Sequence, residues 1–384
     1  MKLLIAVLFL SFYLHASTYC TTSTEFHNPA DKIIFVCLQP NGQWLEIGNP
    51  LDITATGFDY PNLLKTSSGK VLIGYGKYIN NEQFLSLKYF NGVDWVDAAP
   101  LVNYDSSNKV ISVYSQFGAN FTEFNNTFYS FWTGGTDAYV SSSSGTQWQH
   151  KKLIYTGITD ELVRHPEILN TGTNLYAYFG QPFPFVWNIT TGTPVAIGGP
   201  AVSNVYILYT HLAKWNNNLV FAFTSTYPKS GALIEDLSVI KIAMYNGSSW
   251  SWLSTSIQDT PSHFSTRPFL FVINNELYIM YPDYTTLGVQ TILDYQRFRV
   301  KKWNGTSWQR IGDESESFPY CQRFEFLQDG NSVLFSILHW ENGQLKQAVI
   351  KWTNGTFTQV GDAVKIYTNT SSAPFGRVGN IIIN

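Results

Sequence analysis

Short runs that alternate apolar and polar residues fill most of the chain, and glycine turns separate them. The stretch KKWNGTSWQRIGD, Lys301 to Asp313, places Asn-Gly between two such runs, and YFNGVDWVDAAP, MYNGSSWSWLST and KWTNGTFTQVGD have the same form. A period of two predicts half-buried β-strands, and Asn and Gly tolerate the positive φ angles of tight hairpin turns. Helical periodicity is absent from the chain after its N-terminal apolar segment. The pattern therefore predicts an all-β protein built from hairpins.

The hairpins form a repeat. Their turn glycines are 47 to 58 residues apart, and an aromatic residue usually follows two or three positions later, whereas the fourth copy has Val195. A period of about 50 residues with several short strands per unit is typical of a β-propeller. We expect each glycine to lie between the third and fourth strands of a blade, and the tryptophans to pack between blades. The turn glycines are Gly42, Gly92, Gly145, Gly192, Gly247, Gly305 and Gly355.

The two ends of the chain together supply one further unit. The C-terminal TSSAPFGRVGNIIIN resembles the first half of a repeat, and KIIFVCLQPNGQWLEIG near the N-terminus resembles the second half. We therefore predict a seven-bladed propeller of four-stranded antiparallel blades over residues 17–384. Its last blade would take two inner strands from the C-terminus and two outer strands from the N-terminus, which leaves no free sheet edge at the closure.

The repeat length resembles that of kelch and sialidase propellers. In addition, SSSSGTQW, Ser141 to Trp148, resembles the Asp-box turn of sialidases, Ser-x-Asp-x-Gly-x-x-Trp, with Ser143 where that family has Asp. The resemblance implies a propeller fold and a shared way of building a turn.

Composition and the N-terminus point to an extracellular protein. The N-terminal MKLLIAVLFLSFYLHAS has one lysine, an apolar run and small residues, which predicts a signal peptide over residues 1–16. Its apolar run is shorter than the roughly 20 residues that span a bilayer, so the mature chain has no expected membrane span. The chain is 16% aromatic and 13% charged, with a net charge of -3, and this gives no electrostatic case for nucleic-acid binding.

Sequons and cysteines add two expectations. Seven Asn-x-Ser/Thr sequons agree with secretion and predict N-glycosylation, although Asn-Gly is also good turn chemistry by itself. Of the three cysteines, we favour a Cys20–Cys321 disulfide, with Cys37 as a buried free thiol in IIFVCL. The sequons are Asn120, Asn125, Asn188, Asn246, Asn304, Asn354 and Asn369.

Propeller topology assigns the sequons and the polar strand starts to opposite faces. We call the face where the first strand of each blade begins the upper face. Asn188, Asn246, Asn304 and Asn354 are expected in third-to-fourth turns on the lower face, with Asn120 and Asn125 near a lower first-to-second turn. Polar residues at the upper strand starts could bind a ligand or could merely satisfy backbone groups. The candidate ligand-binding residues are Tyr60, His165, His211, Arg267, Asp283 and Arg323.

Recognisable catalytic motifs do not occur. Isolated histidines and three cysteines give no metal-ligand spacing, and nucleotide and nucleophile-elbow motifs are absent, so we expect no metal and no cofactor. The function expected from sequence is a non-catalytic binding module for an extracellular glycan or protein. The alternative is a secreted glycoside hydrolase or lyase that uses acids and arginines at the upper rim, with Asp59, Glu161, Glu167 and Asp283 as its acids and Arg164, Arg267 and Arg323 as an anion-binding cluster.

Overall fold

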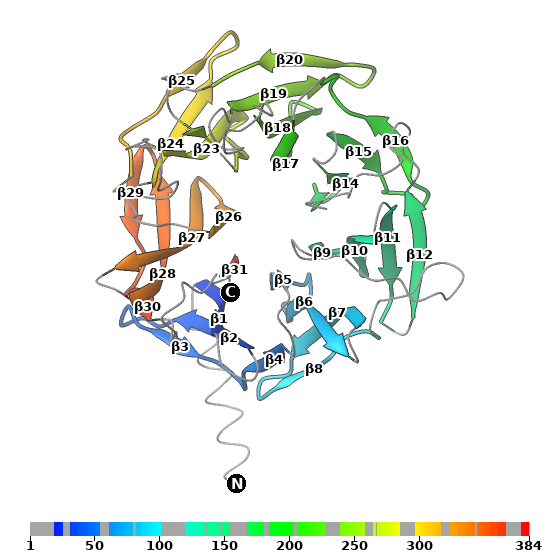
Figure 1. Cartoon of the computed structure of the whole chain (residues 1–384), viewed down its shortest axis with the longest axis vertical. Coiled ribbons are helices and arrows are strands. Elements are labelled where there is room, and N and C mark those ends of the chain that lie inside the picture. The colour runs from blue at the N-terminus through cyan, green and yellow to red at the C-terminus, as the bar shows by residue number, and fades with distance from the viewer. Residues whose placement is uncertain are drawn as a thin grey trace, which may run out of the picture.

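The protein is a seven-bladed β-propeller, as predicted. The computed structural model contains seven antiparallel sheets arranged in a ring around a central axis (Figure 1). It describes residues 19–25, 31–53, 61–79, 82–100, 120–134, 137–145, 147–153, 167–179, 184–202, 206–226, 239–257, 264–265, 267–284, 296–315, 323–341, 344–365 and 378–383.

The first three blades follow one another along the chain, each from its inner to its outer strand. Blade 1 consists of β5 (Asn62–Lys65), β6 (Val71–Ile79), β7 (Glu82–Phe90) and β8 (Trp95–Asp97). Blade 2 consists of β9 (Asn120–Phe124), β10 (Thr127–Gly134), β11 (Asp137–Ser143) and β12 (Trp148–Leu153). Blade 3 consists of β13 (Glu167–Asn170), β14 (Leu175–Phe179), β15 (Phe185–Asn188) and β16 (Val195–Gly198).

The next three blades follow the same order, and blade 5 divides its inner strand into two segments. Blade 4 consists of β17 (Tyr206–Trp215), β18 (Asn218–Thr226), β19 (Val239–Tyr245) and β20 (Trp250–Ser254). Blade 5 consists of β21 (Phe264–Ser265), β22 (Phe269–Ile273), β23 (Glu276–Tyr284), β24 (Gln296–Trp303) and β25 (Trp308–Arg310). Blade 6 consists of β26 (Arg323–Asp329), β27 (Ser332–Glu341), β28 (Gln344–Thr353), β29 (Thr356–Gln359) and β30 (Val364–Lys365).

The closing blade, blade 7, takes one strand from the C-terminus and three from the N-terminus. Its order is β31 (Val378–Ile383), β1 (Tyr19–Glu25), β2 (Asp31–Leu38) and β3 (Trp44–Glu46), and β4 (Leu51–Ile53) also pairs with β2. The expected division of two and two was therefore wrong by one strand. The reason is β1, whose Thr- and Ser-rich sequence YCTTSTE lacks the apolar alternation of the other strands. Blade 7 nevertheless joins the two chain ends in one sheet (Figure 1).

The disulfide expectation was also wrong. Cys20 in β1 and Cys37 in β2 lie directly opposite each other in the ladder, with their Cα atoms 4.1 Å apart, and they form a disulfide. Cys37 is therefore not a free thiol. The third cysteine, Cys321, lies outside the described residues, and the sequence-based pairing failed because it did not recognise β1 as the neighbour of β2.

The turns follow the sequence prediction closely. All seven turn glycines have positive φ angles, between 75° and 109°, and each lies between the third and fourth strands of its blade. In blades 2, 4 and 5 an Asn-Asn pair with positive φ angles forms the first-to-second turn. Glycine and asparagine adopt this backbone region at low cost, so these sequences build short hairpins.

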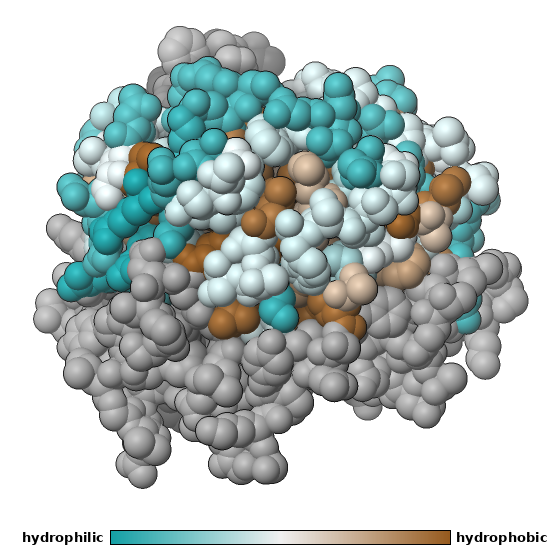
Figure 2. Space-filling model, turned by 90° about the horizontal axis from the view of Figure 1, so that it is seen from above, coloured by the Kyte–Doolittle hydropathy of each residue, from teal (hydrophilic) through white to brown (hydrophobic). Residues whose placement is uncertain are grey.

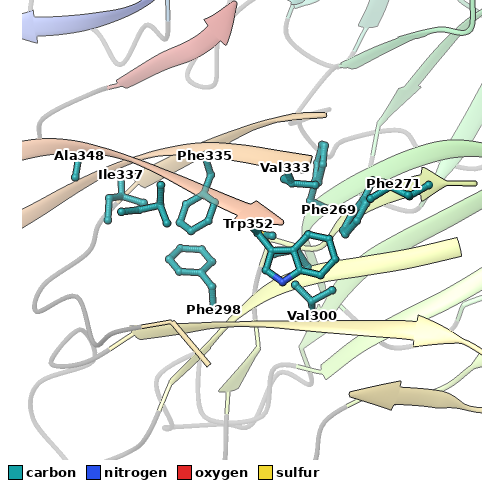
Figure 3. Close-up of a cluster of buried hydrophobic side chains, with 12 residues drawn as sticks. Phe269, Phe271, Phe298, Val300, Val333, Phe335, Ile337, Ala348 and Trp352 are labelled. Atoms are coloured by element: carbon teal, nitrogen blue, oxygen red, sulfur yellow. The ribbon is translucent and has the colours of Figure 1, made fainter. Parts of the chain in front are cut away.

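The hydrophobic core lies between the blades. Between blades 5 and 6, the Phe298 and Phe335 rings face each other with centroids 4.3 Å apart, next to Trp352 and Val300 (Figure 3). Between blades 7 and 1, Trp95 packs edge-on against Phe35 at 5.4 Å. The latter contact confirms that a turn tryptophan serves inter-blade packing.

On the side shown in Figure 2, the described surface is hydrophilic toward the top of the view and mixes neutral and hydrophobic residues below. Among the described residues, four large apolar side chains are notably exposed, and they belong to the third-to-fourth turns or outer strands of different blades: Leu45, Val93, Val195 and Trp252. Among the described residues, no helix has the length and apolar character needed to cross a membrane.

Candidate active site

Two neighbouring inner strands carry an irregularity toward their upper ends. In blade 4, Ile207 pairs with Ser225 and Thr210 pairs with Phe223, so Leu208 and Tyr209 together lie opposite Thr224 alone. In blade 5, three residues separate Ser265 from Phe269, but only two, Tyr281 and Pro282, lie opposite them. Each irregularity is a β-bulge, a device that re-aims side chains and is frequent beside active sites.

The two bulges bring Tyr209 and Arg267 together. The Arg267 guanidinium lies over the Tyr209 ring, 4.5 Å from its centroid, across the seam between blades 4 and 5. Among described residues other than glycine, positive φ angles occur at asparagines and at Arg267, whose φ is 44°. Backbone strain of this kind persists where the surrounding structure fixes it, and it concentrates at functional sites. The Tyr209–Arg267 pair is the first element of the candidate site.

His211 follows Tyr209 on the same strand and has a structural role. Its Nδ1 accepts a hydrogen bond of 3.1 Å from the backbone N–H of Leu270 in blade 5, and its ring packs 4.5 Å from that of Phe269. Burial lowers the pKa of His211 to about 3, so the imidazole is neutral near pH 7. Of the two roles considered for polar residues at upper strand starts, His211 has the second: it satisfies a backbone group and is not free to bind a ligand through Nδ1.

Glu167 and Tyr178 form a carboxylate–hydroxyl pair in blade 3. Glu167 is the first residue of β13 and lies opposite Tyr178 in β14, whose hydroxyl donates a hydrogen bond to Glu167 Oε2. Burial, the charge of Glu167 and this hydrogen bond raise the pKa of Tyr178 well above 10, although a backbone hydrogen bond from Leu212 in blade 4 opposes them. Tyr178 therefore stays protonated and keeps a permanent donor on the Glu167 carboxylate.

Asp283 is engaged in an ion-pair network and not in an open site. Its Oδ2 lies 2.9 Å from Arg299 Nη1, and the two side chains are 4% and 10% exposed. Arg299 Nη2 lies 2.8 Å from Glu314 Oε1, and the Glu314 carboxylate also contacts Arg297 and Arg310. Because a buried charge is stable only when it is paired, this network fixes the upper part of blade 5.

The structure describes the side chains of three of the six candidate ligand-binding residues. His211 and Arg267 lie on neighbouring inner strands, as expected, and Asp283 lies on the second strand of blade 5. Arg323 begins the inner strand of blade 6, and nothing is described of its side chain. Tyr60 and His165 lie outside the described residues, as do Asp59, Glu161 and Arg164. The sequence reasoning missed Tyr209 and the Tyr178 partner of Glu167, because bulges and cross-strand partners leave no signal in a single strand.

The sequon asparagines divide between the two ends of the strands. Asn125 lies in a first-to-second turn, and Asn188, Asn246, Asn304 and Asn354 lie at third-to-fourth turns, as expected. Asn120 is different, because it begins the inner strand β9 at its upper end and its Oδ1 accepts a 3.4 Å hydrogen bond from Asn62 in blade 1. The expected placement of Asn120 near the lower turn was therefore wrong, and Asn369 lies outside the described residues.

The turns need no glycan to explain their asparagines. Asn304 Oδ1 accepts hydrogen bonds from the backbone N–H groups of Thr306 and Ser307, and Asn91 Oδ1 accepts the same pair from Val93 and Asp94 without being part of a sequon. Ser143, in the turn that resembles an Asp-box, likewise accepts a 3.0 Å hydrogen bond from Gly145 N–H. These are local turn solutions.

A Ser–His pair in blade 2 does not form a nucleophile site. Ser141 Oγ lies 2.7 Å from His150 Nδ1 and accepts a 2.7 Å hydrogen bond from Trp132 Nε1. Ser141 has no exposed surface, so a substrate has no access to its oxygen. In the described part of the chain, no group of three or more His, Cys, Asp or Glu residues could hold a metal ion.

Comparison with known proteins identifies similar structures but no family. No protein-family model and no curated protein matches the sequence. An ancestral GH74 enzyme aligns with a TM-score of 0.51 and 12% identity over 90% of this chain and 47% of its own. A thermostable family-43 glycoside hydrolase aligns with a TM-score of 0.41 and 11% identity over 66% of this chain and 96% of its own. An α-L-arabinofuranosidase from Clostridium thermocellum ATCC 27405 aligns with a TM-score of 0.36 and 14% identity over 70% of this chain and 96% of its own.

These comparisons correct the expected function. At such low identity the likeness establishes the propeller fold alone, and the ancestral GH74 enzyme, which aligns with a TM-score of 0.51, is a glycoside hydrolase and not a binding module. The expectation of a non-catalytic binding module is therefore withdrawn. The alternative weighed from the sequence, a glycoside hydrolase, is the one that remains to be proposed and tested.

Proposed function

We propose that the protein is a secreted glycoside hydrolase whose active site lies at the upper end of the axis, over blades 3 to 5. The observation that carries the proposal is the hydrogen bond from Tyr178 to Glu167 at the start of an inner strand. A donor held on a carboxylate stabilises its charged form, because the hydrogen bond is strongest to the anion. Glu167 is therefore suited to act as the base or nucleophile of a glycosidase.

A second carboxylate is needed, because glycosidases use two acids about 5–10 Å apart across the scissile bond. Glu161 is our first candidate for the general acid, because it comes shortly before the inner strand of blade 3 in the sequence, and Asp59, shortly before that of blade 1, is the second; both lie outside the described residues. Asp283 is less suitable, since the Arg299 ion pair would hold it in its charged form. In the Tyr209–Arg267 pair, the ring holds the guanidinium, whose N–H groups can donate hydrogen bonds to a polyhydroxyl substrate.

Secretion and glycosylation belong to the same proposal. Residues 1–16 would direct export, and glycans on Asn125, Asn188, Asn246, Asn304 and Asn354 would cover the lower face. The upper face, with Glu167 and Arg267, would then stay open to a carbohydrate.

The test is hydrolysis by the purified, secreted full-length protein. We would measure sugar release from a panel of aryl glycosides that covers the common pyranosides and furanosides, and from a set of plant and microbial polysaccharides. Glu167→Gln should lower kcat/KM by about 100-fold or more on any active substrate. Glu123→Gln is the matched control, because Glu123 also belongs to an inner strand but lies near its lower end, where it accepts a hydrogen bond from Ser67 N–H. Full activity of Glu167→Gln, or no sugar release from the panel, would reject the proposal.

A further inference from the structure

Among the described residues, three buried hydroxyl groups that have no hydrogen-bond partner there surround the bulge of blade 4. They are the side-chain oxygens of Thr210, Thr224 and Ser225, which are 5%, 0% and 0% exposed. Thr210 follows the bulge on β17, Thr224 lies opposite it, and Ser225 pairs with Ile207 on its other side. A native structure rarely leaves a buried hydroxyl without a partner, and an ordered water is the usual explanation.

Two of the three hydroxyls belong to the same face of the blade. Thr210 lies opposite Phe223, and Ser225 comes two positions after Phe223, so both side chains lie on the Phe223 face of the sheet. Leu212 and Phe221, which continue this face, pack with Tyr178 of blade 3. Thr224 belongs to the other face with Ala222, which packs with residues of blade 5. Thr210 and Ser225 therefore share the seam between blades 3 and 4.

The spacing of this pair suits one bridging water. Diagonal neighbours across two antiparallel strands have Cβ atoms less than about 7–8 Å apart. Two hydrogen bonds of about 2.8 Å that meet at a single water span about 4.6 Å between the outer oxygens at a tetrahedral angle, and at most about 5.6 Å. Thr210 and Ser225 form no direct hydrogen bond with each other, and a water between them could bond to both.

We propose that Thr210 and Ser225 form a buried water-binding site in the seam between blades 3 and 4. The bound water replaces the ladder contact that the bulge interrupts and holds the bulged backbone in place. Since Tyr209 belongs to that bulge, the water also positions the aromatic ring on which Arg267 lies. Thr210 and Ser225 are thus positioning residues, and their role is independent of whether the protein hydrolyses glycosides.

The sign of a stability change tests the proposal. If a water bridges the two hydroxyls, Thr210→Val and Ser225→Ala should each lower the Tm by about 1–3 °C, because each variant leaves the water and the other hydroxyl short of a partner. The decrease in Tm of the double variant should be smaller than the sum of the decreases of the two single variants, because both side chains act through the same water. Thr210→Ser retains the hydroxyl, so its Tm should stay closer to that of the unmodified protein than the Tm of Thr210→Val does.

Ser130→Ala provides the matched control. Ser130 is also fully buried and without a hydrogen-bond partner among the described residues, but its ladder neighbours are Phe121 and Ser141, whose hydroxyl already has partners, so a water there would have no second unpartnered hydroxyl to bridge. Its replacement should leave the Tm unchanged or raise it. A crystal structure should show water density within hydrogen-bond distance of Thr210 Oγ1 and Ser225 Oγ. A raised Tm in both Thr210→Val and Ser225→Ala, or a dry seam in the crystal, would overturn the water site.

Discussion

The Nδ1 atom of His211 accepts a 3.1 Å hydrogen bond from the backbone N–H of Leu270, and this bond joins the inner strands of blades 4 and 5 through a side chain. Inner strands of a propeller face the axis with an unpaired ladder edge, and such edges need partners. Gln328 makes an equivalent connection between blades 6 and 5, because its side-chain amide donates a hydrogen bond to Val272 O and accepts one from Val272 N–H. Side chains of one blade thus complete the backbone hydrogen bonds of the next.

The neutral state of His211 predicts a pH dependence of stability. Its folded pKa of about 3 is lower than the ordinary 6.5, so between these values the unfolded chain binds a proton that the folded protein excludes. The stabilising contribution is complete above pH 6.5 and is lost as the pH falls toward 3, by at most about 1.4 kcal/mol per pH unit. Chemical denaturation of the protein and of His211→Asn between pH 7 and 4 measures it. Parallel pH profiles for the two proteins would contradict the assignment.

Tyr178→Phe should change the pH profile of the proposed hydrolase. Loss of the donor destabilises the charged form of Glu167 and raises its pKa, so the acidic limb of kcat/KM should move to higher pH. Tyr176→Phe is the control, because Tyr176 lies on the same face of β14 but pairs with Leu169, whereas Tyr178 pairs with Glu167. An equal displacement of the acidic limb in both variants would show that Glu167 is not the group that titrates.

Arg299→Met should strongly destabilise the protein. The substitution leaves the buried Asp283 carboxylate without its ion pair, and breaking such a pair costs about 3–5 kcal/mol. Burial alone would raise the pKa of Glu314, but the hydrogen bond from Arg297 and the charges of Arg299, Arg310 and Arg297 outweigh it and hold that pKa below its usual value. Urea denaturation measures the loss.

The exposed pair Lys88–Asp97 provides the comparison for Arg299. Asp97 is 72% exposed, so Lys88→Ala should cost less than about 1 kcal/mol. Similar losses in Lys88→Ala and Arg299→Met would mean that the blade 5 network is not a buried one.

Peptide mapping without reduction should link Cys20 to Cys37. The bond joins neighbouring strands of the closing blade across a sequence separation of 17 residues, for which a loop-entropy contribution of about 3 kcal/mol is expected. The double variant Cys20→Ser/Cys37→Ser should therefore have a lower Tm but still close the ring through β31. Recovery of a Cys20–Cys321 peptide would restore the pairing first expected from the sequence.

Deletion of residues 378–384 should destabilise the whole propeller. The deletion removes β31, the inner strand that pairs with β1 and also contacts β26 and β5 of the flanking blades. Its loss exposes a sheet edge at the axis and opens the ring. Secreted yield and Tm measure the effect, with removal of Asn384 alone as the control. A normal Tm for the shortened protein would contradict closure by the C-terminal strand.

Much of the architecture could be predicted because its signals are local. The positive φ of Gly92 or Gly305 follows from the two-residue hairpins that these glycines close, and the repeat of such turns implies the number of blades. Period-two alternation then identifies strands such as Val239–Tyr245, where every second side chain faces a neighbouring blade. These features depend on backbone sterics and burial within a few residues, so the sequence by itself determined them.

The tertiary structure alone decided which distant residues meet. Cys20 pairs with Cys37 and not Cys321 because an unremarkable Thr/Ser-rich strand joins the closing blade. Tyr209 meets Arg267 because one extra residue in each of two inner strands turns these side chains toward a common seam. Strand register and bulges depend on contacts between blades, and a shift of one residue moves a side chain to the opposite face of its sheet. No pattern within a single strand records that choice.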